Sequence, residues 1–121
     1  MNNKRRAKIK DVINKLNEIM LFYDKDIINN DDFAKDMEIC YMEIEFILSD
    51  EISSYDNIPE SLQCGKIGMQ IEEYIDDLDE CLNLIDEIVE WYDQENKQYN
   101  IEKNYNCLIK ILSDISKIKR R

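Results

Sequence analysis

Apolar residues recur three and four positions apart along most of the chain, which is the spacing of one face of an α-helix. The clearest run lies in residues 67–95, where seven apolar residues alternate four and three apart: Ile71, Ile75, Leu78, Leu82, Ile85, Val89 and Tyr92. Beside this seam, Tyr74, Cys81 and Ile88 form a second apolar edge. A face this broad packs against two partners, so the pattern favours a helical bundle over an isolated two-stranded coil.

The same spacing predicts three further helices, at about residues 8–28, 32–53 and 99–118. Their apolar positions are Ile9, Val12, Leu16, Ile19, Tyr23 and Ile27; Phe33, Met37, Cys40, Ile44 and Ile47; and Ile101, Tyr105, Leu108, Leu112 and Ile115. We therefore expect an all-α fold: one domain over residues 1–121, an antiparallel bundle of about four helices with coiled-coil-like packing. Asp31 or Asp32 is expected to cap the second helix. Residues 96–100 are polar enough for a turn, and the alternative is that the last two helices form one continuous rod.

One corner interrupts the helical pattern, because the only proline and both glycines lie within residues 55–68. Pro59 disfavours helix at the preceding residue, so the second helix should end near residues 53–55. Asn57 is expected to cap a short turn, Gly65 to adopt a positive φ, and Gly68 to allow the next helix to start close to a neighbour. We expect Ile58 and Leu62 to plug the open end of a helical pair, so that Leu62→Asp destabilises the protein. The residues expected to set the corner are Tyr55, Asn57, Pro59, Leu62 and Gly65.

The corner sequence Tyr55-Asp56-Asn57-Ile58-Pro59-Glu60-Ser61-Leu62-Gln63, with a glycine and an acidic helix after it, resembles a family of small acidic helical proteins from phages and other mobile elements. In that family an acidic, heptad-rich helix leads into an aromatic-Asp-Asn-aliphatic-Pro-Glu-Ser-aliphatic-Gln turn, and a second acidic helix follows. The resemblance covers roughly residues 37–92 and implies an origin in a mobile element. This chain departs from the family by an additional helix on each side. It also carries Cys64 and Lys66 to Gly68 where the family has a Ser or Glu and an Arg-Gly.

Net charge narrows the classes of partner. The chain has 27 acidic and 16 basic residues, a formal charge of −11. Nine of the basic residues lie at the two ends: Lys4, Arg5, Arg6, Lys8, Lys10, Lys117, Lys119, Arg120 and Arg121. The acidic body argues against nonspecific nucleic-acid binding, although basic ends that together grip a phosphate backbone are a third possibility. No apolar run approaches the ~20 residues needed to cross a bilayer, so we expect a cytoplasmic protein without membrane contacts.

Catalytic and metal-binding patterns are missing from the sequence. The chain has no histidine, which excludes Ser-His and Cys-His pairs and mixed Cys/His zinc sites. Its four cysteines, Cys40, Cys64, Cys81 and Cys107, are widely spaced and are read as reduced thiols, mostly at core or boundary positions. We expect no enzymatic activity, no cofactor and no metal.

The helix at residues 67–95 carries acids on most positions outside its apolar seam. Such a face is commonly just solvated, but it lacks the lysines and arginines that form stabilising (i, i+4) pairs. Unpaired like charges cost stability, which suggests that the surface binds a partner. The expected partner-binding residues are Glu72, Glu73, Asp76, Asp77, Asp79, Glu80, Asp86, Glu87 and Trp91; the tryptophan is either partly exposed or at the edge of the core.

Two functions fit these features. The first is an anti-CRISPR-like inhibitor from a phage or mobile element, in which acids imitate nucleic-acid phosphates and occupy the basic channel of a host defence protein. The second is a structural or adaptor bundle that associates with itself, for example as a homodimer, and inhibits nothing.

Overall fold

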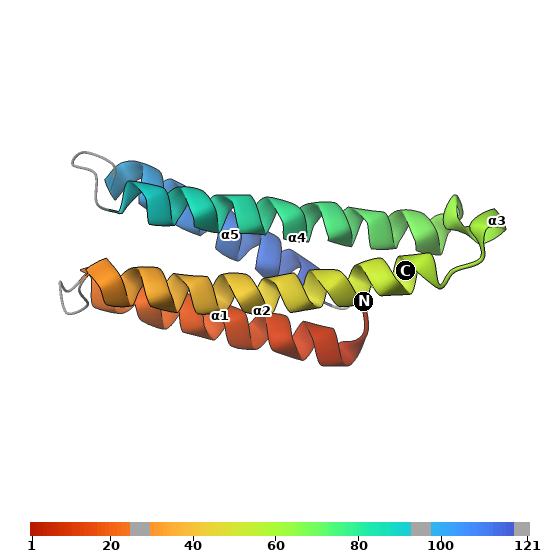
Figure 1. Ribbon diagram of the computed structural model, residues 1–121, viewed down its shortest axis with the longest axis horizontal. Coiled ribbons are helices and arrows are strands. Elements are labelled where there is room, and N and C mark those ends of the chain that lie inside the picture. The colour runs from red at the N-terminus through yellow and green to blue at the C-terminus, as the bar shows by residue number, and fades with distance from the viewer. Residues whose placement is uncertain (25–29, 93–97, 118–121) are drawn as a thin grey trace.

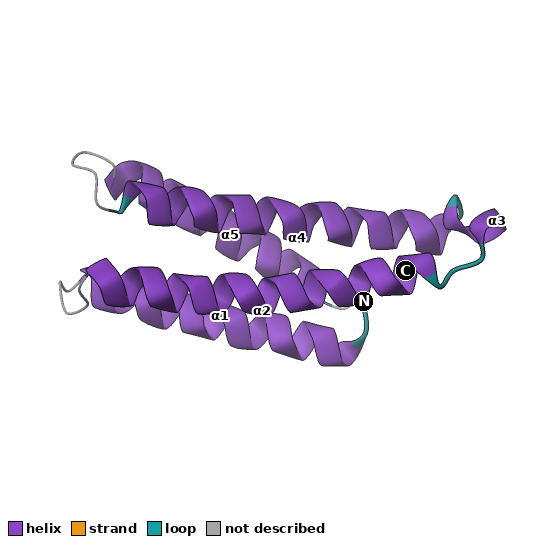
Figure 2. Cartoon of the chain, viewed as in Figure 1, coloured by secondary structure: helices purple, strands orange, loops and turns teal. Residues whose placement is uncertain are grey.

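The computed structural model describes residues 1–24, 30–92 and 98–117. These residues form five helices and no strand (Figure 2), which confirms the predicted all-α class. The elements are α1 (Asn3–Asp24), α2 (Asn30–Asp56), α3 (Glu60–Gln63), α4 (Lys66–Trp91) and α5 (Gln98–Ser116).

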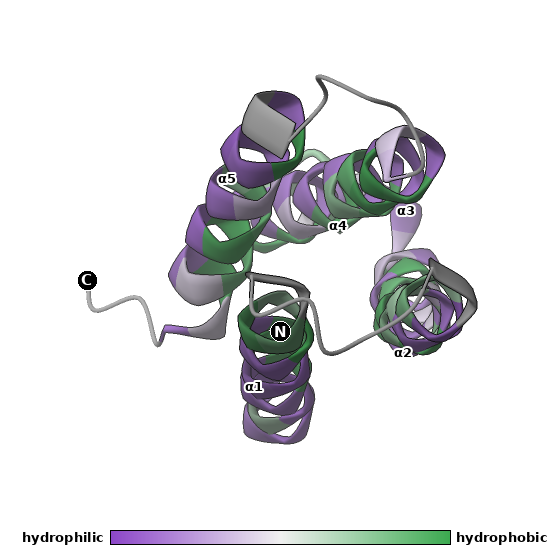
Figure 3. Ribbon diagram, turned by 90° about the vertical axis from the view of Figure 1, so that its left-hand side faces the viewer, coloured by the Kyte–Doolittle hydropathy of each residue, from purple (hydrophilic) through white to green (hydrophobic). Residues whose placement is uncertain are grey.

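The four long helices pack around a common core (Figure 3). α2 contacts α1 and α4, and α5 contacts the same two helices from the other side. Arg5 near the start of α1 pairs with Glu51 near the end of α2, and Tyr55 at the end of α2 bonds to Glu72 near the start of α4. α1 and α2 therefore run in opposite directions, and so do α2 and α4. α5 crosses the other helices obliquely (Figure 1). The predicted helical bundle is confirmed.

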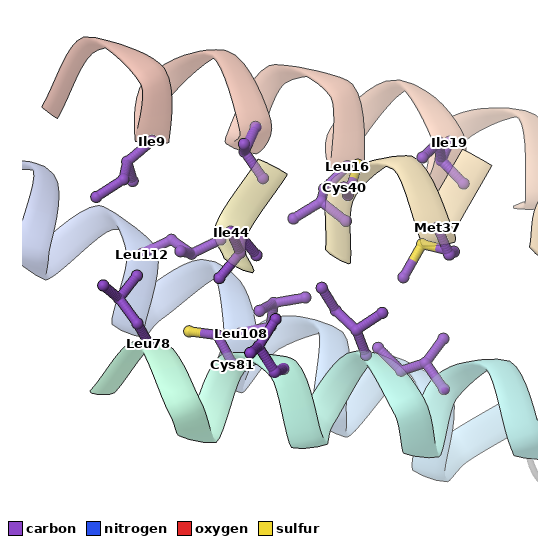
Figure 4. Packing of buried hydrophobic residues seen from close by; sticks show 14 of the residues in the cluster. Ile9, Leu16, Ile19, Met37, Cys40, Ile44, Leu78, Cys81, Leu108 and Leu112 are labelled. Atoms are coloured by element: carbon purple, nitrogen blue, oxygen red, sulfur yellow. The ribbon is translucent and has the colours of Figure 1, made fainter. Parts of the chain in front are cut away.

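The core takes side chains from all four long helices (Figure 4). Ile9 and Leu16 from α1 face Ile44 from α2, Leu78 from α4 and Leu112 from α5; each of the five is fully buried. Burying a side chain of this size stabilises the fold by about 1.5–3 kcal/mol. The three-and-four spacing of the sequence thus identified the residues that hold the helices together.

The buried face of α4 includes the predicted second apolar edge, but its centre is shifted towards that edge. Tyr74, Cys81 and Ile88, expected at an edge, are buried, whereas Ile75 and Val89 from the predicted seam are only half-buried. The reason is that α4 contacts both α2 and α5, so the arc it buries is shared between two neighbours.

The first helix begins at Asn3 rather than near residue 8. Asn2 precedes it, and its Oδ1 accepts a hydrogen bond from the backbone N–H of Arg5 at 2.9 Å. An asparagine in this position satisfies one of the free amides of the first turn. Because the first turn is polar, its start is marked by this cap and not by the apolar period.

The other helix ends lie within a few residues of the expected ones, with two corrections. α2 begins at Asn30, so Asp31 and Asp32 lie in its first turn and do not precede it as caps. α4 and α5 pack side by side, so the alternative of one continuous rod is wrong. Residues 93–95 of the predicted third helix, Ile27 and the last basic residues, Lys119, Arg120 and Arg121, lie outside the described residues.

The corner between α2 and α4 is built around Gln63. Its side-chain Nε2 donates hydrogen bonds of 3.3 Å to the carbonyl oxygen of Tyr55, in the last turn of α2, and to that of Ile58, in the turn that follows. Pro59 occupies the N-cap position of α3 without a side-chain cap, so Asn57 does not have the expected capping role. Gly65 is extended, with φ −78° and ψ 180°, and the expected positive φ is therefore wrong.

Gly68 has the expected close approach. It is buried, and a Cβ added to it would lie 2.0 Å from the carbonyl oxygen of Gln63 and 2.6 Å from the carbonyl carbon. Leu62, by contrast, is 59% exposed and plugs nothing. The side chain lies on α3, a single turn that projects beyond the ends of the long helices (Figure 1), where there is no facing helix to cover it. The expected destabilisation by Leu62→Asp consequently has no structural basis.

Candidate functional site

The predicted acidic residues of α4 lie on the part of the helix that is turned away from the core. Seven of them are exposed and Asp77 is half-buried; the exposed residues are Glu72, Glu73, Asp76, Asp79, Glu80, Asp86 and Glu87. Lys66, in the first turn, is the only basic residue in the sequence of α4. We refer to the eight acids as the α4 acidic surface.

These acids lie on different sides of the helix. Glu72 faces α2, because its Oε1 accepts a hydrogen bond from the Tyr55 hydroxyl. Glu87 faces α5, because its Oε2 accepts a hydrogen bond of 2.8 Å from Asn104 Nδ2. Asp76 lies between those two sides by helical periodicity, and Glu80, seven positions before Glu87, shares the side of Glu87. The α4 acidic surface is therefore a band around the helix and not a single flat patch.

A groove between α2 and α4 adds acids that the sequence interpretation did not include. Glu38 and Tyr41 line it from α2, and Asp86 and Glu90 line it from α4; its remaining lining residues are Ala34, Ile85 and Val89. Both walls are acidic, and no basic residue lines the groove. The spacing of Glu38, Tyr41 and Glu45, three and four apart beside the apolar seam of α2, was the available signal for this wall.

Two tyrosines on this side of the molecule, Tyr55 and Tyr41, have raised pKa values. The hydrogen bond to Glu72, assisted by partial burial and the charge of that carboxylate, raises the pKa of Tyr55 to about 12. The pKa of Tyr41 is also raised, first by desolvation and then by the charges of Asp86, Glu45 and Asp79. Carboxylates from both helices thus act together on a phenol between them, because nearby negative charge disfavours the phenolate.

Trp91 lies at the C-terminal end of α4, four residues after Glu87 and on the same side of the helix. It is half-buried and packs against the core cluster. The tryptophan therefore lies at the edge of the core and is also partly exposed, so each of the two expected positions is partly right. Helical position separates it from the α2–α4 groove.

The cysteines divide into two buried and two exposed residues. Cys40 and Cys81 are buried, whereas Cys64 and Cys107 are exposed, and all four are free thiols. Burial raises the pKa of Cys40 to about 12 and raises the pKa of Cys81 even further. The two core thiols are therefore protonated and poor nucleophiles at neutral pH. Within the part of the chain that the structure describes, no cluster of three metal-ligating side chains is present.

Thiol labelling should separate these two pairs. We expect Ellman's reagent to modify two thiols per chain quickly under native conditions. Cys40 and Cys81 should react more slowly by a factor on the order of 10³ or more, because they need global opening. Removal of the exposed pair, Cys64→Ser with Cys107→Ser, should abolish the fast phase. Fast reaction of that double variant in the absence of denaturant would contradict the buried positions of Cys40 and Cys81.

The N-terminal basic cluster is only partly available to a partner. Arg5 is committed to the buried carboxylate of Glu51, with Nη1 and Oε1 3.1 Å apart, and Arg6 donates to Asn3 Oδ1 at 3.0 Å. Lys4, Lys8 and Lys10 are exposed.

None of the helices in the described ranges, 1–24, 30–92 and 98–117, has the length and apolar character needed to cross a membrane. No family model, no curated protein and no solved structure matches this chain.

Proposed function

We propose that this chain is a non-enzymatic protein-binding module of a phage or mobile element that inhibits a nucleic-acid-handling defence protein of the bacterial host, as anti-CRISPR proteins do. It acts in the host cytoplasm and uses the α4 acidic surface, together with Glu38 and Glu45 of α2, as its contact with the target. The observation that carries the proposal is the acidic lining of both walls of the α2–α4 groove.

The physical basis is electrostatic imitation. A protein that holds nucleic acid presents lysines and arginines to a row of phosphates, and a helix with carboxylates around its exposed part offers that same charge on a rigid rod. Like charges at (i, i+4), such as Asp76 and Glu80, each cost about 0.2–0.5 kcal/mol of helix stability. A binding role accounts for this cost, because the target's cations relieve the repulsion. Electrostatic steering also makes association fast and strongly dependent on salt.

The test is affinity capture from a lysate of the host bacterium at low and at high salt. We expect the wild-type chain to recover a basic nucleic-acid-handling protein at low salt and to lose it at high salt. Neutralising four exposed acids of α4, with Asp76→Asn, Asp79→Asn, Glu80→Gln and Asp86→Asn, should abolish recovery. A matched variant changes net charge equally at exposed sites elsewhere, with Glu18→Gln, Glu60→Gln, Glu102→Gln and Asp114→Asn, and should retain it. Equal loss in both variants would show a bulk charge effect and contradict a specific surface.

Self-association is the second candidate, and the exposed apolar corner favours it. Leu62, Ile67 and Met69 are 59%, 63% and 58% exposed. In this alternative the corners or the basic ends of one copy meet the acidic body of another, and the protein is a structural or adaptor bundle. Light scattering on the purified chain distinguishes the two, since a stable oligomer that captures no host protein supports the structural role.

We propose the finer architecture on the same basis: an antiparallel four-helix bundle with coiled-coil-like packing. The arrangement of α1, α2, α4 and α5, each in contact with two neighbours, supports it.

A further inference from the structure

The side of α2 that is turned away from the core carries a row of exposed apolar residues. Ile39, Met42 and Phe46 expose 50%, 48% and 65% of their surface. They are three and four positions apart, so they share one face of the helix, roughly opposite the buried Cys40 and Ile44. We call these three residues the outer stripe.

The outer stripe has the spacing of a helix–helix seam. Lys35 precedes it by four positions, and Ser49 and Ser53 extend it by three and four; all three are exposed. The described neighbours of α2 along its length are α1 and α4, which pack on other sides of it. On the α1 side, separate hollows open beside Phe46 and beside Ile39. The apolar middle of the longest helix therefore offers a ridge that a further amphipathic helix can cover.

Charge determines which helix fits. Glu38 and Glu45 flank the outer stripe towards α4, and Asp36, Glu43 and Asp50 flank it towards α1. Lys35, at one end, is the only base in the sequence of α2, although Lys15 of α1 pairs with Glu43. On the α1 side, Lys8 and Lys15 also line the hollows beside the outer stripe. An incoming helix with lysine or arginine beside its apolar positions would thus meet acids alone on the α4 side, and a mixture of acids and lysines on the α1 side.

A second copy of this chain meets the wrong charges. If two α2 helices docked antiparallel, with Ile39 against Phe46 of the other copy, Glu38 of one would lie beside Glu45 of the other. Asp36 would similarly approach Asp50. Such like-charge contacts along a short apolar stripe oppose self-association.

We infer that the outer stripe is a docking site for a basic amphipathic helix of a partner protein. Its apolar anchors are Ile39, Met42 and Phe46, and its flanking acids pair with the partner's lysines or arginines. This inference goes beyond the proposed function, because the apolar anchors lie on α2 outside the α4 acidic surface and the site does not require that the partner be a nucleic-acid enzyme. Glu38 and Glu45 lie between the two surfaces and belong to both.

The experiment uses the full chain and a synthetic helix of about 21 residues with leucine at a and d and lysine at e and g. Calorimetry should give a Kd on the order of 1–100 μM for this peptide and no measurable binding for the same peptide with glutamate at e and g. Phe46→Ser should weaken binding at least about tenfold with little change in the melting temperature, because Phe46 is 65% exposed and lies outside the core cluster. Leu62→Ser, at an equally exposed apolar site on the corner, should bind as the wild type does.

Three results would overturn the inference. One is binding that survives in Phe46→Ser. Another is equal binding of the lysine and glutamate peptides. The third is a dimer in light scattering that Phe46→Ser dissociates, since the occupant would then be a second copy. The variant with four neutralised α4 acids should keep most of its affinity for the lysine peptide, so failure of the proposed inhibitor function and failure of this docking site give different patterns.

Discussion

Gly68→Ala should destabilise the protein by about 2–4 kcal/mol, measured as the free energy of unfolding in urea. Glycine to alanine inside a helix normally stabilises by roughly 0.5–1 kcal/mol, so the expected effect has the opposite sign to the helix preference. The reason is steric: the added Cβ would lie 2.0 Å from the Gln63 carbonyl oxygen and 2.8 Å from its Cα, which are backbone atoms that cannot rotate away. Because Gln63 also bonds to the end of α2, the clash displaces the whole corner.

Gly65→Ala is the matched control, three residues earlier in the same corner. Its φ of −78° suits any residue, and its Cβ would meet only the Leu62 carbonyl oxygen, at 3.1 Å. We expect a loss of no more than about 1 kcal/mol there, with the same urea dependence. Equal stability of Gly68→Ala and wild type would show that α3 does not pack on α4 as described.

Arg5→Met should cost about 2–4 kcal/mol, because it leaves a buried carboxylate with one of its partners removed. Glu51 is fully buried at the end of the core, and Arg5 Nη1 lies 3.1 Å from its Oε1. The Met1 amine is 3.9 Å from the same oxygen, while Oε2 is buried without a hydrogen-bond partner. The Arg5 guanidinium is therefore the main group that compensates the buried charge of Glu51. Replacing both residues, Arg5→Met with Glu51→Leu, should recover much of the loss, since no charge then remains buried.

The exposed ion pair between the same two helices provides the comparison. Lys15 and Glu43 form a pair whose side chains are 49% and 34% exposed, and Lys15→Met should cost less than about 1 kcal/mol. Urea titrations of all variants, with unchanged m-values, compare the costs directly. Equal losses in the free energy of unfolding for Arg5→Met and Lys15→Met would contradict the expectation that burial makes the Arg5–Glu51 pair the more important of the two.

The periodic part of this fold could be predicted from the sequence. Ile44, Leu78 and Leu108 are at positions where helical spacing required a buried residue, and each is fully buried. The corner was less predictable, since Leu62 and Ile67 are as apolar as core residues and yet exposed. Local sequence reports which residues can be buried, but burial also needs a facing surface, and α3 extends past the helices that would provide one.

The candidate site shows the same division. The acids of α4 were visible as positions outside an apolar seam, whereas the contribution of Glu38 required the pairing of α2 with α4. That pairing is fixed by contacts distant in sequence, such as Tyr55 with Glu72 and the stacked rings of Phe33 and Tyr92, whose centroids are 3.9 Å apart. The exposed positions of α2 likewise could not be told from buried ones until its neighbours were placed.

Competition with nucleic acid tests most directly whether the α4 acidic surface takes the place of phosphates. The host protein recovered by affinity capture is held at low salt with a fluorescent single-stranded oligonucleotide, and this chain is then added. We expect the wild-type chain to displace the oligonucleotide and more oligonucleotide to reverse the displacement, whereas the variant with four neutralised α4 acids should fail to displace it. Formation of a ternary complex, with oligonucleotide and chain bound together at full occupancy, would contradict it.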